Sequence, residues 1–538
     1  MLSAPPTPAA DPAALARSIE AFLANHPSAA VLEDGRLLFD LRLAQWSVTA
    51  DRGRCLLHLW SPERNAVRAI SAIQQRRGTL RLETRRFGQS KPQTLTLVPD
   101  PDLRTPTARD TARRRYLRTL EQSLAAHFPG WVPDSFRSAM DLEHSFGPAY
   151  ARGILTQGQS AWAVIGAGPD EPPSTIEGAL TLGILWLDYC RQHSNGRRVF
   201  HGLRIVVPSG CAAVTRARMA WMNTALARWE LYELHPSTAE LTPCTVADDG
   251  NLDIRLHRVF DPEAALERAA LGVDHLRALL PPGLVAVTEI RPRGATEIAF
   301  TLHGLEYARV RHTFVPGSFA RQNEISFGAG PGETLLDETT QDLFLDLMDR
   351  LFRGRHPTGS ANDPLFRLQP ERWLESVLRR DLSIIDPAFG SGPVYSQIPA
   401  AASHSASGAP GRGVEESVSS LHSTRTLLDL LTVTRNGRLA ILELKTDDDL
   451  HLPLQALDYW TRVRTLHRAG DLARLGYFPG VQLSPEDPLL CLVAPALHIH
   501  PANETVLRHF APAVPWELIA VDEHWRKDCR VILRKRSA

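Results

Sequence analysis

Lysine is scarce in this chain. Four lysines, Lys91, Lys445, Lys527 and Lys535, stand among 60 basic residues in a sequence of 538, so arginine carries nearly all of the positive charge. A general bias toward arginine is the simplest explanation. The scarcity still makes each lysine informative, because a lysine here is a rare choice.

The sequence also has few cysteines and no long apolar run. Its six cysteines are scattered, with no C-x-x-C pair and no histidine at zinc-ligand spacing, which argues against a disulfide framework or a structural zinc. The most apolar stretch, residues 179–187, is far shorter than the ~20 residues of a membrane-spanning helix. Residues 1–12 lack the basic and apolar regions of a signal peptide. We therefore expect a soluble, cytoplasmic protein.

The formal net charge of +0 hides an uneven distribution. Residues 52–118 hold 16 basic and five acidic residues, a net charge of +11, so the rest of the chain sums to −11. Arginine clusters interleaved with aromatic residues are typical of surfaces that bind nucleic-acid backbones, although a solvated arginine-rich face would look the same. The candidate nucleic-acid-binding residues are Arg76, Arg77, Arg85, Arg86, Arg113, Arg114 and Arg115.

The hydrophobic pattern predicts an α/β protein of several domains. We expect a basic antiparallel β domain over 1–105, an α/β domain over 106–255, a connector of strands and helices over 256–363, and an α/β domain over 364–538. The last part contains an amphipathic helix near residues 371–382. It also contains a Ser/Ala/Gly-rich insert over 400–420, which we interpret as a loop.

The last domain contains a predicted hairpin that carries three charged groups. Its strands, 427–434 and 439–444, are separated by Arg-Asn-Gly-Arg, a strong hairpin signal. Asp429 lies in the apolar first strand, and Glu443 and Lys445 share one face at the end of the second strand. Gln455 and Tyr459 lie four residues apart, on one face of the helix expected next.

Two carboxylates and a lysine in this arrangement suit metal-dependent hydrolysis of phosphodiesters. Carboxylates bind Mg²⁺, the metal polarises a phosphate, and a lysine neutralises developing charge. A buried ion pair without chemistry is the alternative. The scarcity of lysine and the partner residues in the hairpin and helix favour a catalytic site.

The pattern Asp429…Glu443-Leu444-Lys445…Gln455-x-x-x-Tyr459 resembles the PD-(D/E)xK nuclease superfamily. It is most similar to RecB-type nuclease domains and NucS/EndoMS-type mismatch endonucleases with a trailing Gln-x-x-x-Tyr, and the resemblance covers residues 364–500. It implies a restriction-endonuclease-like fold and a Mg²⁺- or Mn²⁺-dependent nuclease, acting on DNA. Leu428 stands where the family name has proline.

The resemblance also implies roles for single residues. Asp429 and Glu443 would be the metal ligands and Lys445 the catalytic lysine, while Gln455 and Tyr459 would support the site. The first helix would supply an acid, either Glu371 or Glu375, of which we favour Glu371. A catalytically silent protein that binds nucleic acid, and a hydrolase of RNA or small molecules on the same fold, are the alternatives. Endonuclease and exonuclease action both stay open.

The middle domain repeats the layout of the last one. The segment 162–168 can be laid over 439–445, which places Gly166 and Gly168 where Glu443 and Lys445 stand. Leu-Asp-Tyr triplets follow in both, ending at Tyr189 and Tyr459, and each next strand ends in proline. We therefore hypothesise a nuclease-like copy that has lost its catalytic groups. Coincidence between two α/β patterns is the alternative, and a different strand order would refute the hypothesis.

Overall fold

The computed structural model describes residues 11–537, with gaps at 27–28, 34–35, 42–43, 52–53, 62–63, 77–78, 86–92, 100–105, 142, 195, 236–237, 247–253, 256–257, 315–320, 330–332, 391, 400 and 403–426. The chain forms two compact units, one made of 1–110 with 260–366 and the other of 111–259 with 367–538. It is a mixed α/β protein with several separate sheets. The insert predicted over 400–420 lies mostly outside the described residues.

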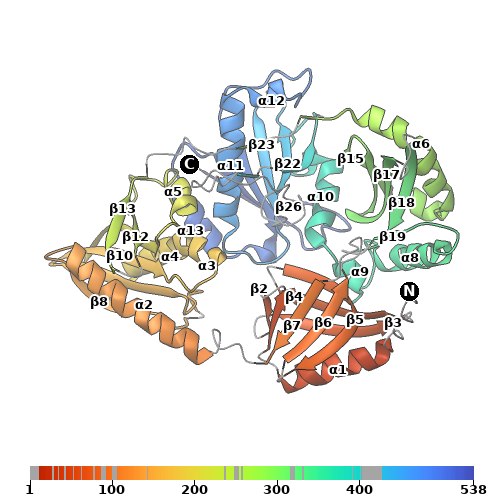
Figure 1. The fold of residues 1–538 in the computed structure, drawn as a ribbon. Coiled ribbons are helices and arrows are strands. Elements are labelled where there is room, and N and C mark those ends of the chain that lie inside the picture. The colour runs from red at the N-terminus through yellow and green to blue at the C-terminus, as the bar shows by residue number, and fades with distance from the viewer. Residues whose placement is uncertain are drawn as a thin grey trace, which may run out of the picture. The chain divides into compact units, whose positions relative to one another are not determined.

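The N-terminal part is an antiparallel sheet covered by one helix (Figure 1). The strand order is β2-β1-β7-β6-β5-β4-β3. Ile19, Phe22 and Leu23 of the helix are buried against sheet residues such as Leu57 and Leu82. The elements are α1 (Pro12–Asn25), β1 (Ala30–Glu33), β2 (Arg36–Asp40), β3 (Gln45–Asp51), β4 (Arg54–Ser61), β5 (Arg64–Arg76), β6 (Thr79–Arg85) and β7 (Gln93–Val98).

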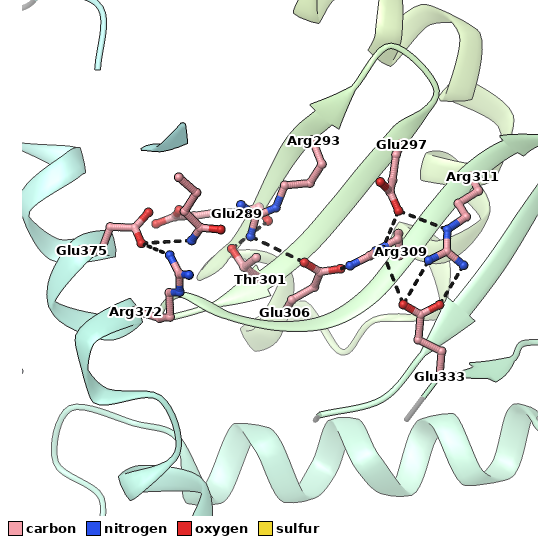
Figure 2. Close-up of polar contacts among 11 residues, drawn as sticks. Glu289, Arg293, Glu297, Thr301, Glu306, Arg309, Arg311, Glu333, Arg372 and Glu375 are labelled. Carbon is pink, nitrogen blue, oxygen red and sulfur yellow. Dashed lines mark hydrogen bonds and ion pairs between the residues drawn. The ribbon is translucent and has the colours of Figure 1, made fainter. Parts of the chain in front are cut away.

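Residues 260–366 form a five-stranded antiparallel sheet, and α6 contacts four of its strands (Figure 1). An ion-pair ladder crosses it: Arg309 Nη1 lies 2.6 Å from Glu297 Oε1, and Arg311 Nη1 lies 2.8 Å from Glu333 Oε2 (Figure 2). The elements are α6 (Pro262–Leu279), α7 (Pro282–Val285), β15 (Thr288–Gly294), β16 (Glu297–Leu302), β17 (Leu305–Phe314), β18 (Arg321–Phe327), β19 (Thr334–Leu335), α8 (Gln341–Gly354) and α9 (Pro364–Arg367).

The middle part is a six-stranded sheet between helices. Leu120 and Leu124 of α2 pack on one face with Trp162 and Val164, and α4 packs on the other. The elements are α2 (Pro106–His127), β8 (Val132–Arg137), β9 (Tyr150–Gln157), β10 (Ser160–Ala167), α3 (Pro173–Glu177), α4 (Ala179–His193), β11 (Val199–Pro208), α5 (Ala213–Met219), β12 (Arg228–Leu234), β13 (Leu241–Cys244) and β14 (Ile254–Arg255).

The C-terminal part is a second six-stranded sheet. Leu439 and Ile441 of its central strand share a core with Leu457 and Trp460 of α11. The elements are α10 (Pro370–Arg380), the 3₁₀ turn Leu382–Ile384, β20 (Tyr395–Pro399), β21 (Ala401–Ala402), β22 (Leu427–Val433), β23 (Leu439–Leu444), α11 (Leu452–Arg468), α12 (Asp471–Arg474), β24 (Leu489–Pro495), the 3₁₀ turn Ala496–His498, α13 (Ala502–Arg508), β25 (Trp516–Val521) and β26 (Val531–Arg536).

These two six-stranded sheets have the same topology. The middle order is β8-β9-β10-β11-β12-β13, and the C-terminal order is β20-β22-β23-β24-β25-β26. In both, the pairs run antiparallel, antiparallel, parallel, parallel and antiparallel. A long helix follows each third strand and a seven-residue helix follows each fourth strand. A different strand order would have refuted the hypothesis of an internal repeat, and the two strand orders are the same.

The two sheets meet through a reciprocal contact. The segments after α5 and α13 form an isolated antiparallel bridge between Met222 and Phe510. The Asn223 N–H donates to the His509 carbonyl, and the Ala511 N–H donates to the Trp221 carbonyl, each at 2.8 Å. Because each sheet contributes the equivalent segment, this contact has approximate twofold symmetry.

The register shows that the overlay predicted from the letters is wrong by one residue. Gly166 of β10 pairs with Val206, and Leu444 of β23 pairs with Val493, each two residues before the proline that ends the next strand. A Cβ on Gly166 would lie 2.4 Å from Tyr116 Oη of α2, on the face opposite α4. Ile165 and Ala167, not the two glycines, therefore stand at the positions of Glu443 and Lys445.

The six cysteines form no disulfide, as expected, and Cys55, Cys190, Cys491 and Cys529 are buried. No helix in the described part of the chain combines the length and apolarity that a membrane crossing requires.

Candidate active site

The predicted hairpin is present, and its turn depends on a glycine. β22 and β23 pair antiparallel, with Leu430 opposite Leu442. Gly437 has a φ of +81°, and a Cβ there would lie 2.2 Å from the Gln482 carbonyl oxygen. A residue with a Cβ would be strained at this φ and would clash with the Gln482 carbonyl, so the turn requires glycine. The turn thus fixes the register that places Asp429 beside Glu443.

Asp429 and Glu443 are two buried carboxylates on neighbouring strands. Asp429 Oδ2 accepts a hydrogen bond from the Leu444 N–H at 2.9 Å. Glu443 is 5% exposed, and its Oε2 has no hydrogen-bond partner among the described residues. Burial raises the pKa of Asp429 to about 6. Burial, followed by the charge of Asp429, raises the pKa of Glu443 well above its usual value.

Lys445 lies two residues beyond Glu443 and extends the same face. Burial alone would lower the pKa of its ammonium group, but Glu443, Asp449 and Asp429 overcome this effect and raise that pKa. Lys445 Nζ lies 3.9 Å from Asp449 Oδ2, and its side chain is 27% exposed. The lysine is therefore charged, anchored by carboxylates and still open to solvent.

The two candidate acids of the first helix occupy different surroundings. Glu375 of α10 is buried, and its Oε2 accepts from Arg372 Nη1 at 2.8 Å (Figure 2). The same oxygen accepts from Gln397 Nε2 at 3.1 Å. Its charge acts on Asp429. Glu371 is half-buried and acts instead on Lys445 and Asp447. Glu375 is therefore the acid whose charge acts on Asp429, whereas Glu371, the acid that we favoured, acts on Lys445; the catalytic role of either acid stays a prediction.

Arg372 and Gln397 are contacts that sequence reasoning missed. Arg372 lowers the pKa of both Asp429 and Glu443, so its positive charge reaches the carboxylate pair. The three-residue spacing of Arg372 and Glu375 on a helix is a signal that could have indicated their ion pair. Gln397 lies on another strand, and no local pattern predicts its contact.

Gln455 and Tyr459 lie one turn apart in α11. Tyr459 is 5% exposed. Burial raises the pKa of its hydroxyl, and the charges of Glu443 and Asp429 raise it further. The structure therefore brings Tyr459 to the carboxylates. Gln455 is half-buried one turn earlier on the same helix.

The predicted arginine surface is described only in part. Arg113 is paired with Glu171 at 2.7 Å, whereas Arg114 and Arg115 are exposed on α2. Arg76 and Arg85 lie in β5 and β6, but their side chains are outside the described set, as are Arg77 and Arg86 altogether. Arg113 is therefore neutralised and is a poor candidate for phosphate binding.

The carboxylate pair has the donor chemistry for a hard divalent cation. Mg²⁺ is bound in proteins by one or two carboxylates, with water and substrate phosphate oxygens completing its shell. The unpartnered Glu443 Oε2 and the second oxygen of Asp429 fit that pattern. Within the described ranges, no group of three or more His, Cys, Asp or Glu side chains is arranged to hold a metal ion. The donors that the site offers to a cation are therefore these two carboxylates.

Comparisons with protein-family models, curated proteins and solved structures find no match to this chain. The interpretation of the site therefore depends on its residues and their geometry alone.

Proposed function

We propose that this chain is a metal-dependent nuclease of the PD-(D/E)xK type that hydrolyses DNA phosphodiester bonds. The observation that carries the proposal is the buried pair Asp429 and Glu443, whose repulsion a cation would relieve, with Lys445 on the same face. Burying two like charges costs several kcal/mol unless something compensates them, so a purely structural role would be an expensive use of these residues.

Asp429 and Glu443 would hold Mg²⁺ or Mn²⁺ through oxygens on adjacent strands. The ion, when bound, polarises the scissile phosphate and neutralises its charge. Lys445 places a charged ammonium group beside this position, where it can orient the attacking water and stabilise the extra negative charge of the transition state. Glu375 holds Arg372 and Gln397 at the edge of the site. Tyr459 covers the carboxylates from α11.

We also propose that the middle domain is an inactive copy of this catalytic domain. The shared strand order and the reciprocal bridge between Met222 and Phe510 support the duplication. Ile165 and Ala167 at the positions of Glu443 and Lys445 leave that copy without a metal ligand or a catalytic lysine. One chain would then hold one hydrolytic site and cut one strand per binding event.

The test is cleavage of end-labelled single-stranded DNA, double-stranded DNA and RNA with Mg²⁺ or Mn²⁺, alongside EDTA. Wild type should cleave DNA, and Glu443→Ala and Lys445→Ala should not. Lys535→Ala is the matched control, because Lys535 lies in β26 and is paired with Glu504. If wild type and all three variants bind nucleic acid without cleaving it, the catalytically silent alternative is favoured. If wild type cleaves RNA alone, the chain would be a ribonuclease instead.

A further inference from the structure

Arg152 occupies the position in the middle domain that Asp429 occupies in the C-terminal domain. Arg152 of β9 lies opposite Ile165, the counterpart of Glu443. Asp429 lies opposite Glu443 when the antiparallel pairing of Leu430 with Leu442 is continued by one residue. Arg152 interacts with Tyr189 and Asp429 with Tyr459, the tyrosines of the two Leu-Asp-Tyr triplets. The middle domain thus has a guanidinium cation at the position where the C-terminal domain has a carboxylate.

The Arg152 guanidinium is buried with part of its hydrogen-bonding capacity unused. The residue is 1% exposed, and Nη2 donates to the Ala139 carbonyl at 2.9 Å. Nε and Nη1 have no partner among the described residues. The guanidinium carbon lies 4.7 Å from the ring centre of Phe146. Two buried N–H donors of a permanent cation are costly to leave unpaired.

Other buried arginines of the same unit have carboxylate partners. Arg204 Nε lies 2.7 Å from Glu230 Oε2, and Arg218 Nη2 lies 2.8 Å from Asp458 Oδ2. The acid nearest in effect to Arg152 is Asp141, which is bound to His144 Nδ1 at 3.0 Å. Arg152 therefore differs from these arginines in lacking a bonded anion within the described part of the chain.

Arg137 provides a second guanidinium group, which lies with that of Arg152 beside the ring of Trp186. The guanidinium carbons of Arg137 and Arg152 lie 5.5 and 5.8 Å from the ring centre of Trp186. Arg137 is exposed, and its charge lowers the pKa of Arg152 after the larger effect of burial. Two cations that repel one another at one indole are stabilised when an anion binds between them.

Aromatic rings lead from this pair of arginines toward solvent. Tyr189 stacks on Trp186 at 5.3 Å and is half-buried, and His193 stacks on Tyr189 at 4.0 Å and is exposed. His144 meets the edge of Tyr189 at 4.7 Å. Stacked rings beside arginines are the combination with which proteins bind nucleotides and their phosphates.

We propose that Arg152 and Arg137 form an anion site for a phosphate group in the middle domain, at the position equivalent to the one where the C-terminal domain would hold its metal. The substrate's backbone phosphate is the source we favour, and that part rests on the proposed nuclease function. Affinity for phosphate itself does not. The inactive copy would then bind the nucleic acid that its partner domain cleaves.

The experiment measures the increase in melting temperature of the full chain with inorganic phosphate, in EDTA so that no metal takes part. A ligand that binds only the folded state raises the melting temperature by an amount that grows with the logarithm of its concentration relative to the dissociation constant. Wild type and Glu443→Gln should show equal increases, and Arg204→Gln should keep the increase because Arg204 already has Glu230. Arg152→Gln should lose it, with affinity at least ~10-fold weaker. An unchanged increase in Arg152→Gln would overturn the proposal.

Arg137→Ala covers the case in which Arg152→Gln fails to fold, because Arg137 is exposed. It should weaken phosphate binding severalfold, and full affinity in this variant would count against the site. A short single-stranded oligonucleotide then distinguishes the source: binding that is tighter than that of phosphate and severalfold weaker in Arg137→Ala identifies the backbone. Equal binding of the oligonucleotide to wild type and Arg137→Ala would overturn the assignment to nucleic acid. Arg152-dependent phosphate binding without any cleavage would separate this inference from a failure of the nuclease proposal.

Discussion

The carboxylate of Asp429 accepts the amide proton of Leu444 at 2.9 Å, one residue past Glu443. This bond crosses between β22 and β23 and holds the two acidic residues together without neutralising either. The backbone thus holds two carboxylates close together although their negative charges repel each other. This repulsion and the burial of both groups determine the pH dependence that we expect.

We expect activity to rise between pH 5 and pH 7 at subsaturating Mg²⁺. The pKa of Asp429 is raised to about 6, and metal binding needs the carboxylate form, so the fraction of competent enzyme increases about tenfold across this range. The raised pKa of Glu443 should extend the increase to higher pH. Initial cleavage rates in a series of overlapping buffers measure this. A profile that is flat from pH 5 to pH 7 would contradict it.

Glu443→Gln should stabilise the metal-free protein at pH 8. A carboxyl group whose pKa is raised on folding binds more protons in the folded state, so its contribution to stability falls as pH rises through the window between the two pKa values. The cost of the ionised form grows as pH rises through that window, and a neutral glutamine avoids it. Urea unfolding in EDTA measures the change.

Glu517→Gln is the control for this prediction. Glu517 is also buried in the C-terminal sheet but is paired with Arg534 at 2.6 Å, so its neutralisation should destabilise the protein. Added Mg²⁺ should then raise the melting temperature of wild type but not of Glu443→Gln. Equal effects of the two substitutions would mean that Lys445 and Arg372 compensate the charge of Glu443 as fully as Arg534 compensates that of Glu517.

Arg372→Ala should move the pH profile of cleavage toward higher pH. Arg372 lowers the pKa of Asp429 and Glu443, so the loss of its charge raises both. Arg380→Ala is the matched control, since Arg380 is an exposed arginine in the same helix. A profile that keeps its midpoint while the maximal rate falls would assign Arg372 a purely structural role.

The sequence was sufficient to predict the hairpin, because its signals are local. Asn-Gly predicted the turn, and period-two alternation predicted that Glu443 and Lys445 share a face. The side chains that surround Asp429 could not be predicted in the same way. Gln397 reaches Glu375 from a separate strand, and nothing in the local pattern of either residue indicates the contact.

The correspondence between the middle and C-terminal sheets was also not predictable from local sequence patterns. Matching letters placed Gly166 over Glu443, yet Gly166 faces α2 because a slip of one residue along a strand moves a side chain to the other face. Only the strand pairing fixed the correspondence with Ile165. The same pairing showed that Arg152 is the counterpart of Asp429, which the sequence alone did not indicate.

Arg114→Ala and Arg115→Ala should each weaken DNA binding and lower the salt dependence of the binding constant. Both residues are exposed on α2, and an arginine that neutralises one phosphate contributes a slope of about −0.9 in log K against log salt. Arg113→Ala should leave that slope unchanged, because Arg113 is already paired with Glu171. Fluorescence anisotropy at several salt concentrations measures the slopes, and equal slopes for all three variants would contradict the assignment.

The ion pair between Arg218 and Asp458 should be a main link between the middle and C-terminal parts. Arg218 donates to both carboxylate oxygens, at 3.0 and 2.8 Å, and its third nitrogen donates to the Glu177 carbonyl. Arg218 is 7% exposed, so removing either partner leaves the other charge uncompensated at a cost of about 3–5 kcal/mol.

Single and double substitutions of Arg218 and Asp458 with alanine, followed by urea unfolding, give the coupling free energy of the pair. The exposed pair Arg530 and Asp528, at 2.9 Å on the same unit, is the control and should couple by less than about 1 kcal/mol. A coupling for Arg218 and Asp458 no larger than that of the control would mean that packing around Trp221 and Trp460, whose rings lie 4.8 Å apart, holds the copies together instead.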